Sequence, residues 1–273
     1  MISSAWFAAL AALFIWWFST GAILLVVRRA EHRGRLAHLR ATVMALPLMG
    51  GGVWLFELTR HLETVASAYL AFFAAIAIWG WVELAFLTGV VAGPNTTHCH
   101  DGARGWERFI RAYGTIAYHE TLLVLILFVM LVTSYAAPNS VGLWTFIVLF
   151  FARISAKLNL FLGVPKINLE FIPQVLAHVP SHFRISRLNW LFPFSVSFMT
   201  FAVYCWAERL YSATTPHEVV GFALLAAITA LALLEHWLMV LPLPDERLWR
   251  WMLPTRKAAG EARKSRRDDL RDA

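Results

Sequence analysis

Long apolar runs alternate with short polar segments along the whole chain. Each run is about 20 residues or longer, the length that an α-helix needs to cross roughly 30 Å of hydrocarbon. Seven stretches qualify as transmembrane helices: residues 4–27, 39–59, 65–92, 113–136, 141–163, 189–210 and 217–241. The pattern therefore predicts an all-α, polytopic membrane bundle of about seven transmembrane helices.

Proline and glycine residues mark the expected ends and irregularities of these helices. Pro94, Pro138 and Pro165 follow the third, fourth and fifth runs, where a helix is expected to stop. Pro47 and the run Gly50–Gly52 lie inside the second, which should be kinked or closely packed there. The first run lacks a basic leader and is followed by arginines, so it is expected to be retained as a helix.

Composition supports the membrane class. The chain has 273 residues, of which 59% are hydrophobic and 15% charged, and its mean hydropathy is +0.60. A typical soluble domain is roughly 45–50% apolar and about 25% charged, so soluble and disordered proteins are excluded. Two cysteines, Cys99 in a polar loop and Cys205 in an apolar run, provide no disulfide framework.

The distribution of Lys and Arg predicts the orientation. Twenty of the 24 follow the first, third, fifth and seventh runs, and only Arg60 and Arg209 lie on the opposite side. By the positive-inside rule the N-terminus is periplasmic and the C-terminus cytoplasmic, in a bacterial cytoplasmic (inner) membrane. Residues 1–255 are expected to form the transmembrane domain and 256–273 a basic, disordered tail. The net charge of +7 thus reflects topology and contact with the lipid bilayer, with no nucleic acid implied.

Ionisable residues inside the apolar runs form the main chemical signal. Each costs about 2.5–3.5 kcal/mol at a helix centre, so each requires a reason. Counted inward from the cytoplasmic ends, they fall at about 9–15 Å depth at 1.5 Å per residue. We call this set the polar layer: Glu83, His119, Glu120, Arg153, Lys157, Glu235 and His236.

Two interpretations of the polar layer remain open. One is a buried ion-pair network that fixes which helices are neighbours. The other is a binding site, in which Arg153 and Lys157 share a helix face because they are four residues apart. The Glu and His side chains of the polar layer are suitable ligands for a metal ion, although Glu-x-x-His pairs and the HExxH motif are absent from the sequence. The candidate metal ligands are Glu83, His119, Glu120, Glu235 and His236.

Six segments of the chain carry unusual motifs: Trp79–Gly89, Gly102–Phe109, Tyr118–Glu120, Arg153–Pro165, Asn189–Pro193 and Glu235–Pro244. Together these segments resemble the PuhE-type photosynthetic complex assembly proteins of phototrophic bacteria. The resemblance extends from about Phe14 to Pro254, with the motifs in order and at matching spacing. One departure is Val82, where the family often has a histidine before the glutamate, which weakens any metal scheme that needs it.

The resemblance implies a role in photosynthesis. The family is encoded beside the genes for the reaction-centre H subunit and bacteriochlorophyll synthesis. It is associated with assembling the reaction centre and core antenna, or with modulating the supply of bacteriochlorophyll. The protein is then expected to hold a reaction-centre or light-harvesting subunit, bacteriochlorophyll or a precursor. The residues expected to contact the pigment are His119, His236, Arg153, Lys157 and Asn159.

Two alternatives to a non-enzymatic assembly factor stay open at this point. The first is a membrane metalloenzyme of bacteriochlorophyll or carotenoid metabolism, with iron held by the Glu and His residues of the polar layer. The second is a purely structural subunit, in which the layer only orders the bundle.

The predicted topology can be tested with reporter fusions. Fusions at Asn139 and Thr214 should report a periplasmic position, and fusions at Gly34, Gly102 and Gly260 a cytoplasmic one, because of the strong basic asymmetry. Alkaline phosphatase and fluorescent-protein activities measure the two sides. A single fusion on the wrong side would mean that one span is miscounted.

Overall fold

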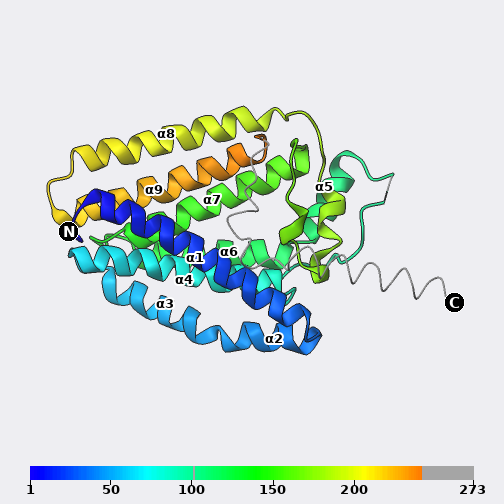
Figure 1. The fold of residues 1–273 in the computed structure, drawn as a ribbon, viewed down its shortest axis with the longest axis horizontal. Helices are drawn as coiled ribbons and strands as arrows, with labels where there is room; N and C mark the ends of the chain where they lie inside the picture. Colours follow the sequence, from blue (N-terminus) through cyan, green and yellow to red (C-terminus); the bar gives the residue numbers. More distant parts are fainter. Residues whose placement is uncertain (101, 242–273) are drawn as a thin grey trace, which may run out of the picture. The chain divides into compact units, whose positions relative to one another are not determined.

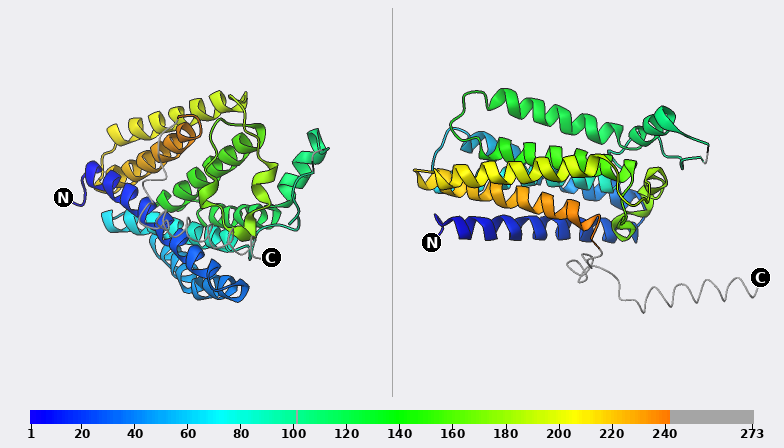
Figure 2. Two further views of the ribbon diagram at one scale, coloured as in Figure 1. Left: turned by 45° about the vertical axis from the view of Figure 1, so that its right-hand side comes forward. Right: turned by 90° about the horizontal axis from the view of Figure 1, so that it is seen from above.

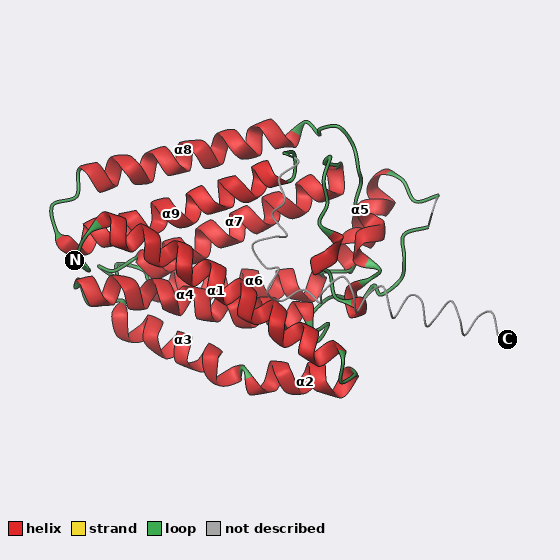
Figure 3. Cartoon of the chain, in the orientation of Figure 1, coloured by secondary structure: helices red, strands yellow, loops and turns green. Residues whose placement is uncertain are grey.

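The computed structural model describes residues 1–100 and 102–241, and these contain helices and loops without a strand (Figure 3). The described helices belong to one compact unit, Met1–Pro242. The predicted all-α class is confirmed, whereas the predicted boundary at residue 255 and the tail 256–273 lie outside the described residues. In order, the α-helices are α1 (Ala5–Glu31), α2 (Arg35–Met44), α3 (Leu46–Thr59), α4 (Val65–Leu87), α5 (Gly105–Gly114), α6 (Ala117–Thr133), α7 (Val141–Leu162), α8 (Leu191–Tyr211) and α9 (Pro216–Leu238).

The helices agree with the expected number of spans. Within the described ranges, six are long and apolar enough to cross a membrane, when α2 and α3 are taken together as residues 35–59. The pair α5 and α6 gives a seventh if it is one span bent by 70°. The break between α2 and α3 falls at Ala45, beside Pro47, and Gly52 packs closely on α4. The expected irregularity of the second span is therefore confirmed.

Several helix ends differ from the expected boundaries by three to five residues, and those of α4 and α6 lie next to the polar layer. α4 ends at Leu87 instead of residue 92, because Gly89 takes a positive φ of 73° that turns the chain. α6 covers only Ala117–Thr133 of the expected 113–136. The preceding residues form α5, an amphipathic helix that the hydropathy pattern did not resolve.

The loop after α4 explains the bend between α5 and α6. The backbone N–H of Asn95 donates to the Gly114 carbonyl at 3.0 Å, and the Asn95 side-chain amide donates to the Arg111 carbonyl at 2.9 Å. Gly93 lies so close to this break that a Cβ atom there would be 2.1 Å from the Gly114 oxygen. The loop thus satisfies the last carbonyls of α5 and fixes where α6 begins.

The helices run alternately up and down, so that the segments joining them gather at two ends (Figures 1 and 2). The α1–α2, α4–α5 and α7–α8 segments, which carry the basic residues, lie at one end. We call it the basic end. Short 3₁₀ turns at Leu169–Phe171, Gln174–Leu176 and Val179–His182 cover it, and buried Leu176 packs near Phe86.

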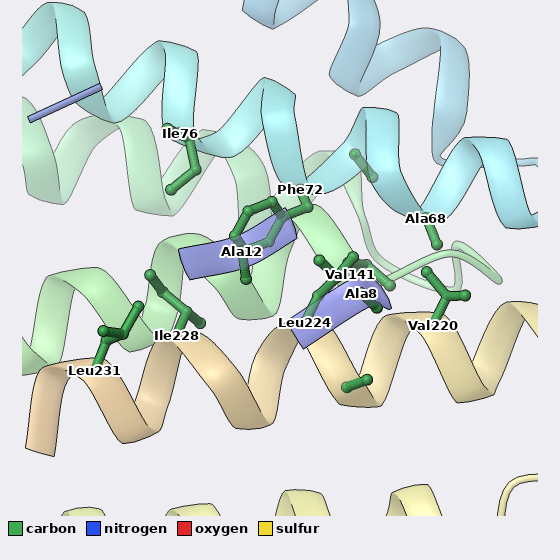
Figure 4. Packing of buried hydrophobic residues seen from close by; sticks show 12 residues of the cluster. Ala8, Ala12, Ala68, Phe72, Ile76, Val141, Val220, Leu224, Ile228 and Leu231 are labelled. Carbon is green, nitrogen blue, oxygen red and sulfur yellow. The ribbon is translucent and has the colours of Figure 1, made fainter. Parts of the chain in front are cut away.

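α4 is the central helix, buried on most of its circumference. Small residues of α1 and α4 pack against larger ones of α9, which lets the helix backbones approach closely (Figure 4). α4 and α9 both begin with a capping box, at Thr64 and Thr215 respectively. The labelled members of this core are Ala8, Ala12, Ala68, Phe72, Ile76, Val141, Val220, Leu224, Ile228 and Leu231.

The contact at Gly93 gives a test of the fold. Gly93→Ala should destabilise the protein by about 1–3 kcal/mol or more, since backbone atoms must move to admit the methyl group. Gly50→Ala is the matched control, because nothing lies within 4 Å of a Cβ at Gly50. Thermal unfolding of the purified protein in detergent measures both. Equal unfolding temperatures for the two variants would contradict the described packing.

Candidate functional site

α7 carries two polar stripes that face different neighbours. Arg153 and Lys157 form one stripe, and Ser155 and Asn159 form the other, each with a spacing of four residues. Because Ser155 is two residues from Arg153, the stripes are about 200° apart around the helix axis. The polar layer is therefore divided into two parts with different chemistry.

The first part is a cluster of ion pairs that joins α7 to α4 and α6. Arg153 Nη2 donates to Glu83 Oε2 of α4 at 2.8 Å. Lys157 Nζ donates to Glu120 Oε1 of α6, and also lies 5.6 Å from the centre of the Phe86 ring. Each cation thus has its own carboxylate, and the attraction within each pair offsets the desolvation free energy of placing these charges inside the bundle.

His119 lies within this ion cluster, and its hydrogen bonding is incomplete in the described part of the protein. Its side chain is fully buried, and its Nε2 is 3.9 Å from Glu83 Oε1, which is too long for a hydrogen bond. In the described part of the protein, both imidazole nitrogens and Glu83 Oε1 lack a hydrogen-bond partner. The Phe86 ring centre is 4.5 Å from that of the imidazole. Buried polar atoms without partners are rare, so this is a place where a bound group would be accommodated.

His236, by contrast, belongs to a saturated network on the other stripe. Its Nδ1 is 2.8 Å from the Ala232 carbonyl oxygen, which can only accept, so Nδ1 must carry the proton. In the neutral ring Nε2 then accepts from the Ser155 hydroxyl, at 3.0 Å. No ring nitrogen of His236 is free for a ligand.

The network continues from α7 to α8. Asn159 donates to the Ser155 carbonyl at 2.9 Å and to the Ser195 hydroxyl at 3.0 Å. Asn189 donates to Asn159 Oδ1 at 3.0 Å, and its own Oδ1 accepts from the first backbone N–H groups of α8. We call this set the amide network, and its role is to fasten α7, α8 and α9 to one another.

Glu235 lies apart from its sequence neighbour His236. It is exposed at the surface of the described bundle, where Trp16 of α1 hydrogen-bonds to it. It interacts electrostatically with Arg153 and Glu83. Glu235 therefore borders the ion cluster, not the amide network.

The five residues named as candidate metal ligands do not converge on one point. Glu83 is beside His119, Glu120 is paired with Lys157, and the remaining two belong to different surroundings. In the described ranges no group of three His, Cys, Asp or Glu residues could hold a metal ion. The side chains expected to contact a pigment divide in the same way: His119, Arg153 and Lys157 in the ion cluster, Asn159 and His236 in the amide network.

Some members of these clusters were not singled out from the sequence. Phe86, Ser155 and Ser195 have side chains that suit an apolar helix, so neither hydropathy nor insertion cost marks them. The one available signal was the spacing of Ser155 and Asn159, four residues apart inside an apolar run.

Fold and site together define a polytopic, all-helical membrane protein with a partly unsatisfied polar cluster near one end of the bundle. Residues 2–260 match the family described as "Protein of unknown function (DUF3623)", and the chain belongs to this family. A relative from Rhodobacter capsulatus, the "Uncharacterized 30.4 kDa protein in puhA 5'region", is 53% identical over 254 residues, which cover 93% of each chain. No solved structure matches.

The pairing of Lys157 with Glu120 can be tested by a double-mutant cycle. Glu120→Ala should destabilise the protein by about 3–5 kcal/mol, because it leaves the lysine charge buried without a partner. The double variant Glu120→Ala with Lys157→Ala should recover much of this loss.

Denaturant unfolding in detergent measures the coupling. The pair of Arg60 with the exposed Glu57 serves as the control, and its coupling should be below about 1 kcal/mol. If the double variant is no more stable than Glu120→Ala alone, the two residues are not partners.

Proposed function

We propose that this protein is an integral membrane assembly factor for the photosynthetic reaction centre and core antenna, and that it acts without catalysing a reaction. It would hold bacteriochlorophyll, a precursor or a pigment-binding subunit during insertion. The observation that carries the proposal is the relative encoded in the puhA 5′ region, a photosynthesis gene region. At 53% identity over nearly the whole chain, a shared role in this process is the simplest expectation.

The geometry supports one histidine over the other as the pigment ligand. Neutral imidazole can bind the central magnesium of a bacteriochlorophyll through a ring nitrogen that has a free lone pair. His119 has both ring nitrogens without a described partner, whereas both nitrogens of His236 are engaged. We therefore assign the ligand role to His119 and a structural role to His236.

Access to His119 would depend on α6. This helix is peripheral: four of its residues are buried, and its outer face exposes long apolar side chains. Its charged contact with the bundle is the Lys157–Glu120 pair, close to His119. Loosening this pair would let the basic end of α6 move away from Phe86 and open the space around the imidazole.

A deletion tests the proposed function. A phototrophic strain lacking this protein should assemble less reaction centre and core antenna, while its general membrane proteins stay unchanged. The in-membrane absorption of the assembled complexes, measured against total membrane protein, gives the yield. A deletion strain with normal pigment and normal complexes would overturn the proposal.

Histidine variants separate an assembly role from catalysis. In an assembly factor, His119→Ala should retain partial activity, because water or a neighbouring residue can replace a reversible axial ligand. His217→Ala, at the other end of α9, is the control for loss of a buried imidazole. In an iron enzyme a missing ligand would abolish turnover, so one specific biosynthetic precursor accumulating in both His119→Ala and His236→Ala would favour the metalloenzyme instead.

A further inference from the structure

α1 and α9 pack together at one end of the bundle and separate toward the basic end (Figure 1). Ala8 and Ala12 of α1 lie in the same core as Leu224 and Ile228 of α9 (Figure 4). Further along, α1 moves onto α4, where Ile23 lies 3.5 Å from the position of a Cβ on Gly80. Beyond Trp16, α9 is therefore no longer covered by α1.

The residue that this separation uncovers is Glu235. Leu224, Ile228 and Leu231 form the stripe of α9 that faces the core, and Glu235 continues the same stripe one turn later. The first three are buried, whereas Glu235 is exposed. If α1 covered all of α9, the position of Glu235 would be part of the core. Because α1 and α9 separate there, the position holds an exposed carboxylate instead.

Arg153 is accessible together with Glu235. Its side chain is 40% exposed, although its partner Glu83 is 90% buried. Arg153 interacts electrostatically with Glu235 as well as with Glu83. A guanidinium has five N–H groups, and the Nε–H of Arg153 has no partner within the described ranges. The other oxygen of the carboxylate that Arg153 binds, Glu83 Oε1, is also buried and has no partner among the described residues.

We propose that Arg153, held electrostatically by Glu235, binds the polar head of an amphiphile that enters between α1 and α9. Exposed charges next to a membrane interior require a polar cover, and this cover must supply hydrogen-bond acceptors to the guanidinium. Carbonyl, ester or phosphate oxygens have this chemistry. The proposal deepens the proposed function and rests on it only for the choice of pigment as one probe.

The surroundings fit an amphiphile better than a free anion. Trp16 is half-buried beside Glu235, and Leu234, next along α9, is 49% exposed. The charged side chains of Arg153 and Glu235 thus have apolar neighbours. This combination suits a molecule with an oxygen-bearing head and a hydrocarbon tail that stays in the lipid. Glu235 would repel a small free anion, whereas a neutral carbonyl or ester oxygen, such as a phospholipid or pigment also carries, can accept from Arg153 without this repulsion.

The experiment uses the full chain in phosphatidylcholine nanodiscs. One arm adds bacteriochlorophyll a and measures the pigment retained after gel filtration by absorption. The other adds dioleoylphosphatidylglycerol and counts retained lipid by native mass spectrometry. The test variants are Arg153→Lys, which keeps the charge but loses the guanidinium, and Glu235→Gln. Their matched controls are Arg209→Lys and Glu208→Gln, exposed residues of α8 at the opposite end.

We expect at least one probe to be retained by the unsubstituted protein. Its dissociation constant should rise at least tenfold in Arg153→Lys and several-fold in Glu235→Gln, and stay unchanged in both controls. The retained probe identifies the source of the head group as pigment or phospholipid. Pigment binding that depends on His119 but not on Arg153 or Glu235 would overturn this inference while leaving the proposed function intact.

Failure of both probes to bind would also overturn the inference, and the deletion strain would then decide the proposed function separately. A labelling measurement guards against misfolded variants. In a background with Cys99→Ser and Cys205→Ser, maleimide should modify Glu235→Cys more slowly when the bound probe is present. An equal labelling rate with and without probe would place the amphiphile elsewhere and reject the site.

Discussion

Arg153 sets the arrangement of the bundle, because a guanidinium about two turns inside α7 must meet a carboxylate. The partner is Glu83, near the end of the central helix α4. This pairing fixes the rotation of α7, and the rotation in turn directs Lys157 to Glu120 on α6. The opposite stripe, Ser155 and Asn159, is left to face α8 and α9. One partly buried ion pair thereby determines which helices contact each side of α7.

The two polar clusters differ in how well they are satisfied. The amide network uses neutral groups, and the hydrogen bonds that link Ser155, Asn159 and Asn189 to their partners have ordinary lengths of 2.9–3.0 Å. The ion cluster holds two carboxylates, two cations and an imidazole, and among the described residues the imidazole and one carboxylate oxygen have no hydrogen-bond partner. A satisfied network makes a bundle rigid and specific, whereas an unsatisfied one implies that something else completes it. The difference separates a structural role from a binding role within one layer.

Hydropathy and insertion cost predicted most of the architecture, since both depend on residues taken one at a time. The apolar runs gave the spans, and the cost of charge in lipid identified Glu83, Arg153 and Lys157. The bend at Gly114 could not be found this way, because it depends on the Gly93 loop closing against a distant part of the chain. The predicted depth of 9–15 Å was also too uniform. Glu83 and His119 lie within about one turn of a helix end, because α4 stops early and α6 starts late.

His119 and His236 show why the sequence could not divide the polar layer. Each is next to a glutamate in an apolar run, and each is buried, so composition and spacing treat them alike. Their difference arises from neighbours on other helices. Ser155 reaches His236 because α9 packs against α7, while His119 meets Phe86 and a carboxylate already taken by Arg153. The hydrogen bonding of each histidine, and therefore its role, thus depends on helix packing. The packing in turn follows from the pairing of Arg153 with Glu83.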